Sequence, residues 1–259
     1  MGKVHRYSDG SGRPDGITAA EWEQRVNLAA FYRVLAGFGW DDLVFTHVSA
    51  RIPDAPDYYL LNPYGSLFEE ITASSLVKVN LTRGRADRSD KLINPAGVTI
   101  HGAVLVARTD VQCVVHLHTP SGVAVSAQED GLLPITQTAL WPCSSLAYHD
   151  YEGLALDSDE QVRLARDLGD KTFMILRNHG TLAVGGSIPD AFLAIYEFER
   201  ACEAQVLAQA GGARLRHVPE SIVAGIQVQE AESTDGLGGQ IAWPAMLRRL
   251  DRQDPSFRH

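Results

Sequence analysis

Two histidines, two residues apart, are the sharpest chemical feature of this sequence. They lie in the apolar segment Cys113-Val-Val-His-Leu-His118. The segment predicts a β-strand, in which residues i and i+2 share one face and lie roughly 6.5–7 Å apart. The imidazoles of His116 and His118 can then converge on one ion, while Leu117 points into the core. Neutral imidazole binds zinc, iron, manganese or copper, so the pair predicts a metal site where a strand ends.

A third histidine, His179, falls in the turn Arg177-Asn-His-Gly180 between two predicted strands. Gly180 permits a positive φ and lets the backbone approach a ligand closely. Three neutral histidines at one end of a sheet would leave positions on a metal open, as catalytic sites do. Each histidine taken alone also fits a structural role, as a half-exposed strand residue or a hydrogen-bonded turn residue.

Other acid–base side chains are scattered along the chain. His47 stands at a predicted strand end, where a site residue and a turn residue are equally good interpretations. His101 lies within a predicted helix, which favours a buried supporting role over metal binding. Tyr64 occupies a predicted turn, and Tyr151 closes the run Tyr148-His-Asp-Tyr151, whose setting the sequence leaves open. The sequence contains no phosphate-binding loop, no dinucleotide-binding glycine motif and no G-x-S-x-G nucleophile motif.

Holding these side chains requires a sheet, and the apolar patterning predicts one. Apolar residues at helical spacing predict helices over 18–37, 98–108 and 188–210. Short apolar runs predict a hairpin within 43–62 and strands over 76–81, 111–118, 172–176 and 182–184. Several of these strands are joined by turns too short for a crossover helix. We therefore predict an α/β domain with a central, largely antiparallel sheet covered by helices.

The chain divides into three predicted parts. Residues 1–16 are polar and glycine-rich and are expected to form a flexible arm. Residues 17–212 carry the helices and strands of the domain. Residues 213–259 form an extension that is expected to pack on the domain or on a neighbouring subunit, with Trp243 as its anchor.

Composition excludes several classes of protein. The net charge of −9 argues against nucleic-acid binding, which needs a basic face. The 259 residues contain no apolar stretch near 18 residues, so we expect no membrane helix, and the N-terminus resembles no secretory signal. Three widely spaced cysteines make a disulfide framework improbable and favour a cytoplasmic protein.

These motifs resemble the class II aldolase/adducin family, and in particular its bacterial adducin-like branch. The similarity covers roughly residues 22–210, and it is carried by Thr46-His-Val-Ser-Ala-Arg51, Asn62-Pro-Tyr-Gly65, Asn94-Pro-Ala-Gly-Val-Thr-Ile-His101, His116-Leu-His118-Thr-Pro120, Tyr151-Glu-Gly153 and Arg177-Asn-His-Gly180. L-fuculose-phosphate aldolase and L-ribulose-5-phosphate 4-epimerase are related members. The resemblance implies a three-layer α/β/α fold and a homotetramer. It also implies a divalent ion on His116, His118 and His179, with zinc expected and iron or manganese as alternatives.

The sequence departs from the sugar-phosphate aldolases at three places. Their glutamate, a metal ligand and general base, falls on Gly97. Their phosphate-binding serines fall on Pro95 and Ala96, so we predict a substrate without a phosphate. Their tyrosine acid falls on Thr138, beside the polar Gln137. The general base is then a metal-bound hydroxide, the substrate's own carboxylate or His47.

The remaining site residues follow from the same comparison of motifs. The catalytic candidates are His47, Tyr64, Gln137 and Tyr151, and the substrate-binding candidates are Ser49, Asn94 and Gly97.

Three functions fit these features. The first is a metal-dependent lyase that acts on a small non-phosphorylated hydroxy-carbonyl or aromatic substrate. It would cleave a C–C bond of that substrate and release a small aldehyde, or would decarboxylate it. The second is a non-haem iron oxygenase on the same scaffold. The third is a non-catalytic interaction protein like the animal adducins, whose basic tails this chain lacks.

Overall fold

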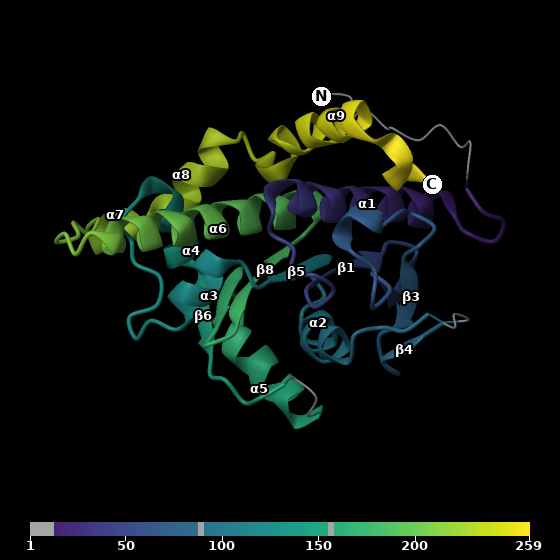
Figure 1. Ribbon diagram of the computed structural model, residues 1–259, viewed down its shortest axis with the longest axis horizontal. Coiled ribbons are helices and arrows are strands. Elements are labelled where there is room, and N and C mark those ends of the chain that lie inside the picture. The colour runs from purple at the N-terminus through teal and green to yellow at the C-terminus, as the bar shows by residue number, and fades with distance from the viewer. Residues whose placement is uncertain (1–12, 88–90, 155–157) are drawn as a thin grey trace.

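The computed structural model describes residues 13–87, 91–154 and 158–259, which are built around one central sheet (Figure 1). Within these residues the sheet has eight strands in the order β4-β3-β2-β1-β5-β8-β7-β6. They are β1 (His47–Ile52), β2 (Ala55–Leu61), β3 (Val77–Asn80), β4 (Arg85–Ala86), β5 (Cys113–Leu117), β6 (Leu146–His149), β7 (Phe173–Leu176) and β8 (Gly180–Gly185). Neighbouring strands are antiparallel except for the parallel pair β6–β7. The predicted α/β class with a largely antiparallel sheet is confirmed.

Helices cover both faces of the sheet, which gives three layers (Figure 1). One face packs against α1 (Ala19–Phe38) and α6 (Ile188–Ala210), and α9 (Trp243–Gln253) packs on α1 from outside and extends the same core. The other face packs against α2 (Pro95–Ala107) and α5 (Ser158–Leu168). Successive residues of β7 divide between the two cores, with Phe173 in the first and Met174 in the second. A strand buried on both faces needs an apolar residue at every position, which explains the unbroken apolar runs.

The main helices begin at polar caps that the sequence shows. The Thr18 side chain accepts a hydrogen bond from the Glu21 N–H at the start of α1, and Ser187 caps α6 in the same way. Helix α2 begins three residues before its predicted start, because Asn94 caps it and Pro95 fits the first turn.

Several elements were not predicted. Among them are α3 (Pro120–Ser126), α4 (Gln137–Ser144), β4, β6, α9 and the two short helices α7 (Glu220–Val223) and α8 (Ile226–Ser233). Helix α4 contains Pro142, which normally interrupts a helix and therefore hides this one from pattern analysis. Strand β6 ends in Tyr148 and His149 and lacks the unbroken apolar run that identifies β7.

The C-terminal extension returns to the first helix of the same chain (Figure 1). The Trp243 ring packs against Phe31 and Phe192, with ring centroids 6.0 Å and 5.5 Å apart. Its indole Nε1 donates to Asn27 Oδ1 at 2.8 Å. Trp243 thus anchors the extension on α1 and α6. At the other terminus, residues 1–12 of the expected arm lie outside the described residues.

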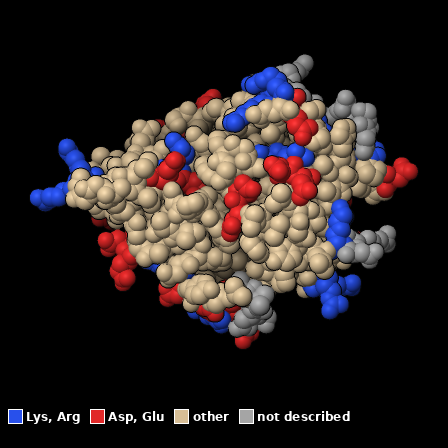
Figure 2. Space-filling view, viewed as in Figure 1, with Lys and Arg blue, Asp and Glu red and all other residues tan. Residues whose placement is uncertain are grey.

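The surface carries charges of both signs. Figure 2 shows acidic side chains interspersed with basic ones over the viewed face. None of the helices in the described part of the chain is long and apolar enough to cross a membrane.

Candidate metal centre

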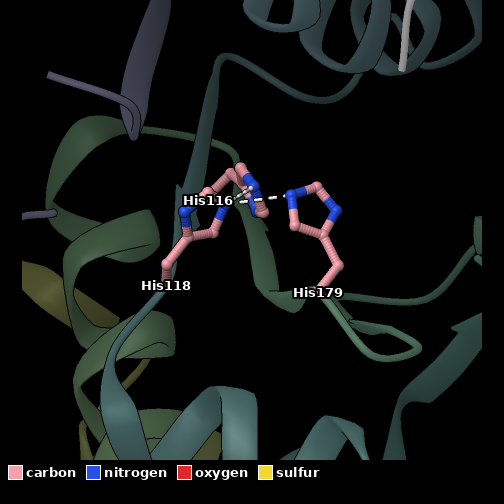
Figure 3. Close-up of side chains that lie close together, drawn as sticks. All are labelled: His116, His118 and His179. Atoms are coloured by element: carbon pink, nitrogen blue, oxygen red, sulfur yellow. Dashed lines mark hydrogen bonds between the residues drawn. The ribbon is translucent and has the colours of Figure 1, made fainter. Parts of the chain in front are cut away.

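Three histidine rings meet at one end of the sheet (Figure 3). His116 and His118 come from the end of β5, and His179 comes from the turn between β7 and β8. The Nε2 atom of His118 lies 2.9 Å from Nε2 of His116 and 2.9 Å from Nε2 of His179. The sequence-predicted ligand set is therefore brought together, with Leu117 buried on the opposite face.

The second nitrogen of two of these rings is held by an acceptor. Nδ1 of His116 lies 2.9 Å from the Thr181 carbonyl oxygen, and Nδ1 of His118 lies 3.0 Å from Asp42 Oδ2. Because both partners only accept, each Nδ1 carries the proton. The Nε2 atoms of the neutral rings then present lone pairs to the centre, and metal-binding histidines are commonly oriented in this way.

This arrangement fits a divalent cation. Facing lone pairs at 2.9 Å repel one another unless a positive charge lies between them. Two nitrogen ligands about 2.1 Å from an ion and at right angles are about 3.0 Å apart. Burial also favours neutral rings, since it holds the pKa of His116 well below its usual range and lowers that of His179 to about 4. His116, His118 and His179 could hold zinc, iron or manganese.

Gly180 is needed here for a reason other than the expected one. Gly180 does not use the positive φ that a glycine permits, and Asn178 takes that conformation instead, with φ 57°. A Cβ on Gly180 would lie 2.3 Å from the Leu117 carbonyl oxygen. The glycine therefore lets β8 start directly against β5, which places His179 beside His118.

Beside the triad, a second group of imidazoles links β1 to α2. His47 pairs across the sheet with His116, and their ring centroids are 5.3 Å apart. Its Nδ1 lies 2.9 Å from His101 Nε2, and His101 Nδ1 lies 2.7 Å from Ser49 Oγ. Burial is the main reason that the pKa of His47 lies well below its usual range, and it lowers that of His101 to about 3. The result is a buried chain, Ser49–His101–His47, of uncharged groups.

Gly97 lies directly against this chain. A Cβ on Gly97 would lie 3.1 Å from the nearest ring carbon of His47. The His47 ring thus fills the space that a side chain at position 97 would enter. Ser49 is fully buried, and its hydroxyl is hydrogen-bonded to His101.

The other predicted site residues lie at different distances from the triad. Tyr151 is closest: its ring centroid is 6.4 Å from that of His179, and the residue is 54% exposed. Asn94 caps α2 through the Ala96 N–H, and its amide donates to the Phe45 carbonyl. Tyr64 lies in the turn after β2, and Gln137 begins α4 on the face covered by α6. Among the described residues, no hydrogen bond or ring contact joins Tyr64 or Gln137 to the triad, and their roles stay predictions.

Behind the triad, sequence reasoning missed a buried carboxyl group. Glu199 on α6 accepts hydrogen bonds from the hydroxyls of Thr119 and Thr181, which flank the ligand-bearing segments. Burial raises its pKa to about 7. The sequence offered one signal, a carboxyl residue within the apolar stripe of a helix.

A comparison of sequences places the chain among related proteins. The model of the Class II Aldolase and Adducin N-terminal domain matches residues 26–206. A Pseudomonas aeruginosa protein named for the aldolase class 2 family is 54% identical over 93% of this chain and 94% of its own length. Mouse alpha-adducin is 48% identical over 73% of this chain, which corresponds to 26% of adducin.

Solved structures of class II aldolases resemble this chain as well. An aldolase II superfamily protein from Pseudomonas syringae superposes with a TM-score of 0.88 and 45% identity, over 95% of this chain and 98% of that one. L-fuculose 1-phosphate aldolase from Glaciozyma antarctica superposes with a TM-score of 0.80 and 25% identity, over 95% and 97% of the two chains.

Proposed function

Because the chain belongs to the class II aldolase and adducin family, we propose that it is a metal-dependent lyase that cleaves a C–C bond in a small, non-phosphorylated hydroxy-carbonyl compound. The observation that carries the proposal is the convergence of three imidazole Nε2 atoms on one point. The structurally similar Glaciozyma protein, an L-fuculose 1-phosphate aldolase, supports the reaction class.

Two of the three ligands would have their own support in this chain. His116, His118 and His179 would hold the ion, and Asp42 and the Thr181 carbonyl would fix two of the rings. A bound divalent ion supplies Lewis acidity toward the negative charge that develops on the substrate oxygen. Zinc is our first choice of metal, with iron and manganese as alternatives that also accept imidazole.

We assign the proton transfer to His47, in place of the missing glutamate at position 97. When His101 accepts from His47 Nδ1–H, Nε2 of His47 is a base and can take the hydroxyl proton of the substrate. Once Nε2 of His47 has taken that proton, it is the acid that can return it, while Nδ1–H stays hydrogen-bonded to His101, which contacts Ser49 on its other side. Cleavage then yields an aldehyde and an enolate, and the enolate carbon receives the proton back.

The start of α2 supports a substrate without a phosphate. Pro95 has no N–H, and the Ala96 N–H is donated to the Asn94 side chain. Those groups are therefore not available to bind a phosphate dianion, which needs several donors. Tyr151, exposed beside His179, is the best placed of our predicted residues to contact the substrate.

The experiment is a substrate screen with metal-loaded enzyme, in which aldehyde release is measured. We expect matched hydroxy-carbonyls without a phosphate to react and their phosphorylated forms to react poorly. His47→Gln should lower kcat by about 100-fold or more, which is the usual contribution of a general base, and leave metal content unchanged. Exposed His217 provides a matched His217→Gln control. Full activity of the His47 variant would refute its assigned role.

The relation to adducin favours one alternative, a non-catalytic interaction protein. The observation behind it is Gly97, which removes a side chain that the sugar-phosphate aldolases use. In that case the protein would bind metal without releasing aldehyde from any substrate of the screen. Oxygen uptake that depends strictly on Fe²⁺ would instead favour the oxygenase. We also propose that the protein is cytoplasmic and forms a homotetramer, as members of the family do. The molar mass of the purified protein, measured by light scattering, tests the homotetramer.

A further inference from the structure

A buried carboxyl group lies behind the triad, on the face of the sheet opposite to the His116 ring. Glu199 is 2% exposed and belongs to the side of α6 that packs against β8 and β5. Its neighbours on that side of the helix are the core residues Ile195, Phe198 and Cys202. A carboxyl group among apolar side chains is costly to bury unless hydrogen bonds satisfy it. The position of Glu199 is thus explained by its partners rather than by the apolar core.

Each oxygen of Glu199 is bonded to a different segment of the metal centre. Oε2 accepts a hydrogen bond from the Thr119 hydroxyl, and Oε1 accepts one from the Thr181 hydroxyl. Thr119 directly follows the ligand His118, at the point where β5 leads into α3. Thr181 lies in β8, shortly after the ligand His179. One carboxyl group therefore ties together the two segments that supply all three ligands.

Thr181 connects Glu199 directly to one of the ligands. Its carbonyl oxygen accepts a hydrogen bond from Nδ1–H of His116 at 2.9 Å, which orients that ring toward the centre of the triad. Its side chain points to the α6 side of β8, where Glu199 holds the hydroxyl. A shift of Thr181 would therefore change the direction in which His116 presents its Nε2 atom.

Thr119 is fixed from two sides. Its Oγ1 accepts a hydrogen bond from the Gly122 N–H at 2.9 Å, which caps α3, while its hydroxyl proton is donated to Glu199. The packing around these groups is tight, because a Cβ on Gly122 would lie 3.0 Å from Thr119 Oγ1 and 3.2 Å from Glu199 Oε2. The same Cβ would lie 3.0 Å from the methyl carbon of Thr181. The three side chains therefore have little freedom to rearrange.

We propose that Glu199 is a positioning residue of the metal centre, which holds Thr119 and Thr181 so that the three histidines converge in a geometry that binds a divalent ion tightly. The inference rests on the proposed ion at the triad, but it concerns the affinity for that ion rather than the reaction. Groups of a functional site must be held within about 0.5 Å of their productive geometry. Loss of a group that orients metal ligands from outside typically weakens metal binding by about 10- to 100-fold.

Two substitutions of Glu199 separate its hydrogen bonds from its charge. Glu199→Met keeps the length of the side chain but offers no strong acceptor to the two threonine hydroxyls. Glu199→Gln keeps both contacts, because its carbonyl oxygen accepts from one hydroxyl and its amide donates to the oxygen of the other. We therefore expect Glu199→Met to raise the dissociation constant for Zn²⁺ by about 10- to 100-fold, and Glu199→Gln to stay within about 3-fold of the wild type.

Competition between the full-length protein and a zinc chelator of known affinity measures the dissociation constant of the folded protein. Urea unfolding of the metal-free proteins, measured in parallel, gives the stability of the fold. A merely structural role would lower the unfolding free energy of Glu199→Met but leave its dissociation constant unchanged. Glu203→Met is the matched control, at a partly exposed glutamate one turn further along α6, and should bind Zn²⁺ as the wild type does.

Threonine variants keep the test decisive if Glu199→Met fails to fold. Thr181→Val keeps the shape of the side chain without its hydroxyl and should weaken Zn²⁺ binding by about 10-fold, whereas Thr181→Ser retains the hydroxyl and should not. A folded Glu199→Met or Thr181→Val protein that binds Zn²⁺ as tightly as the wild type would overturn the proposal and leave the metal centre intact. A wild-type protein that binds no Zn²⁺ would refute the metal centre itself, and the proposal with it.

Discussion

Substitution of Gly97 tests whether the His47 ring occupies the space of a side chain at that position. A Cβ at Gly97 would lie 3.1 Å and 3.2 Å from two ring carbons of His47. Comfortable carbon contacts are about 3.5–4.0 Å. The ring cannot easily retreat, because it is buried and hydrogen-bonded to His101. We therefore expect Gly97→Ala to strain the site.

The size of the effect follows from two opposing contributions. Overpacking a tight core typically costs about 1–3 kcal/mol. Replacing a helical glycine by alanine gains up to about 1 kcal/mol. In the wild type, Gly97→Ala should therefore cost about 0–3 kcal/mol of unfolding free energy. In a His47→Ala background the strain is absent, and the same change should stabilise by up to about 1 kcal/mol. The coupling between the two positions should be about 1–3 kcal/mol.

The coupling is measured by urea unfolding of the wild type, Gly97→Ala, His47→Ala and the double variant. A chelator in the buffer removes any contribution from bound metal. Gly102→Ala is the matched control, since Gly102 lies in the same helix and a Cβ there would have no heavy atom within 4 Å. Its effect should be independent of His47. Additive effects of Gly97→Ala and His47→Ala, within about 0.5 kcal/mol, would refute the inference that the ring replaces the missing side chain.

Three other substitutions probe the supports of the site. Glu199, with its pKa raised to about 7, favours the protonated form in the folded state, so it costs stability as pH rises through 7. With chelator present, the unfolding free energy of Glu199→Gln relative to that of the wild type should rise by up to about 3 kcal/mol between pH 5 and pH 8. Unfolding free energies of the two proteins that change in parallel with pH would contradict this. Gly180→Ala should cost at least about 1–3 kcal/mol and weaken metal binding, because its Cβ meets the Leu117 carbonyl, and unchanged metal affinity would argue against that contact. Trp243→Ala should cost about 3–5 kcal/mol in thermal unfolding, whereas Ile241→Ala, at an exposed neighbour, should cost little, and equal losses would exclude Trp243 as the anchor.

Much of the triad was predictable because its information is local. The strand alternation places His116 and His118 on one face, and the turn before Gly180 contains His179. Their common location followed from both strands ending at the same edge of one sheet. The helix caps Thr18 and Ser187 were equally local, since each acts within three residues, whereas the Asn94 cap was missed.

The rest of the site depends on contacts between distant segments. The register that pairs His47 with His116 is set by packing across the sheet, and nothing near His47 in the sequence encodes it. The His101 contact with His47 joins residues 54 positions apart. Likewise, the hydrogen bonds that join Glu199 to Thr119 and Thr181 need the docking of α6 on the sheet. Such placements follow from the whole core.

The metal content of wild-type protein and of His116→Ala is the most direct test of the central claim, that the three histidines bind a divalent ion. Both proteins, purified without a tag and dialysed against zinc, iron or manganese, would be analysed by elemental mass spectrometry, with His217→Ala as control. We predict that the wild type and the control bind an ion per chain that His116→Ala loses. Equal metal content in all three proteins, or no bound ion in any of them, would contradict the assignment of His116, His118 and His179 as a metal centre.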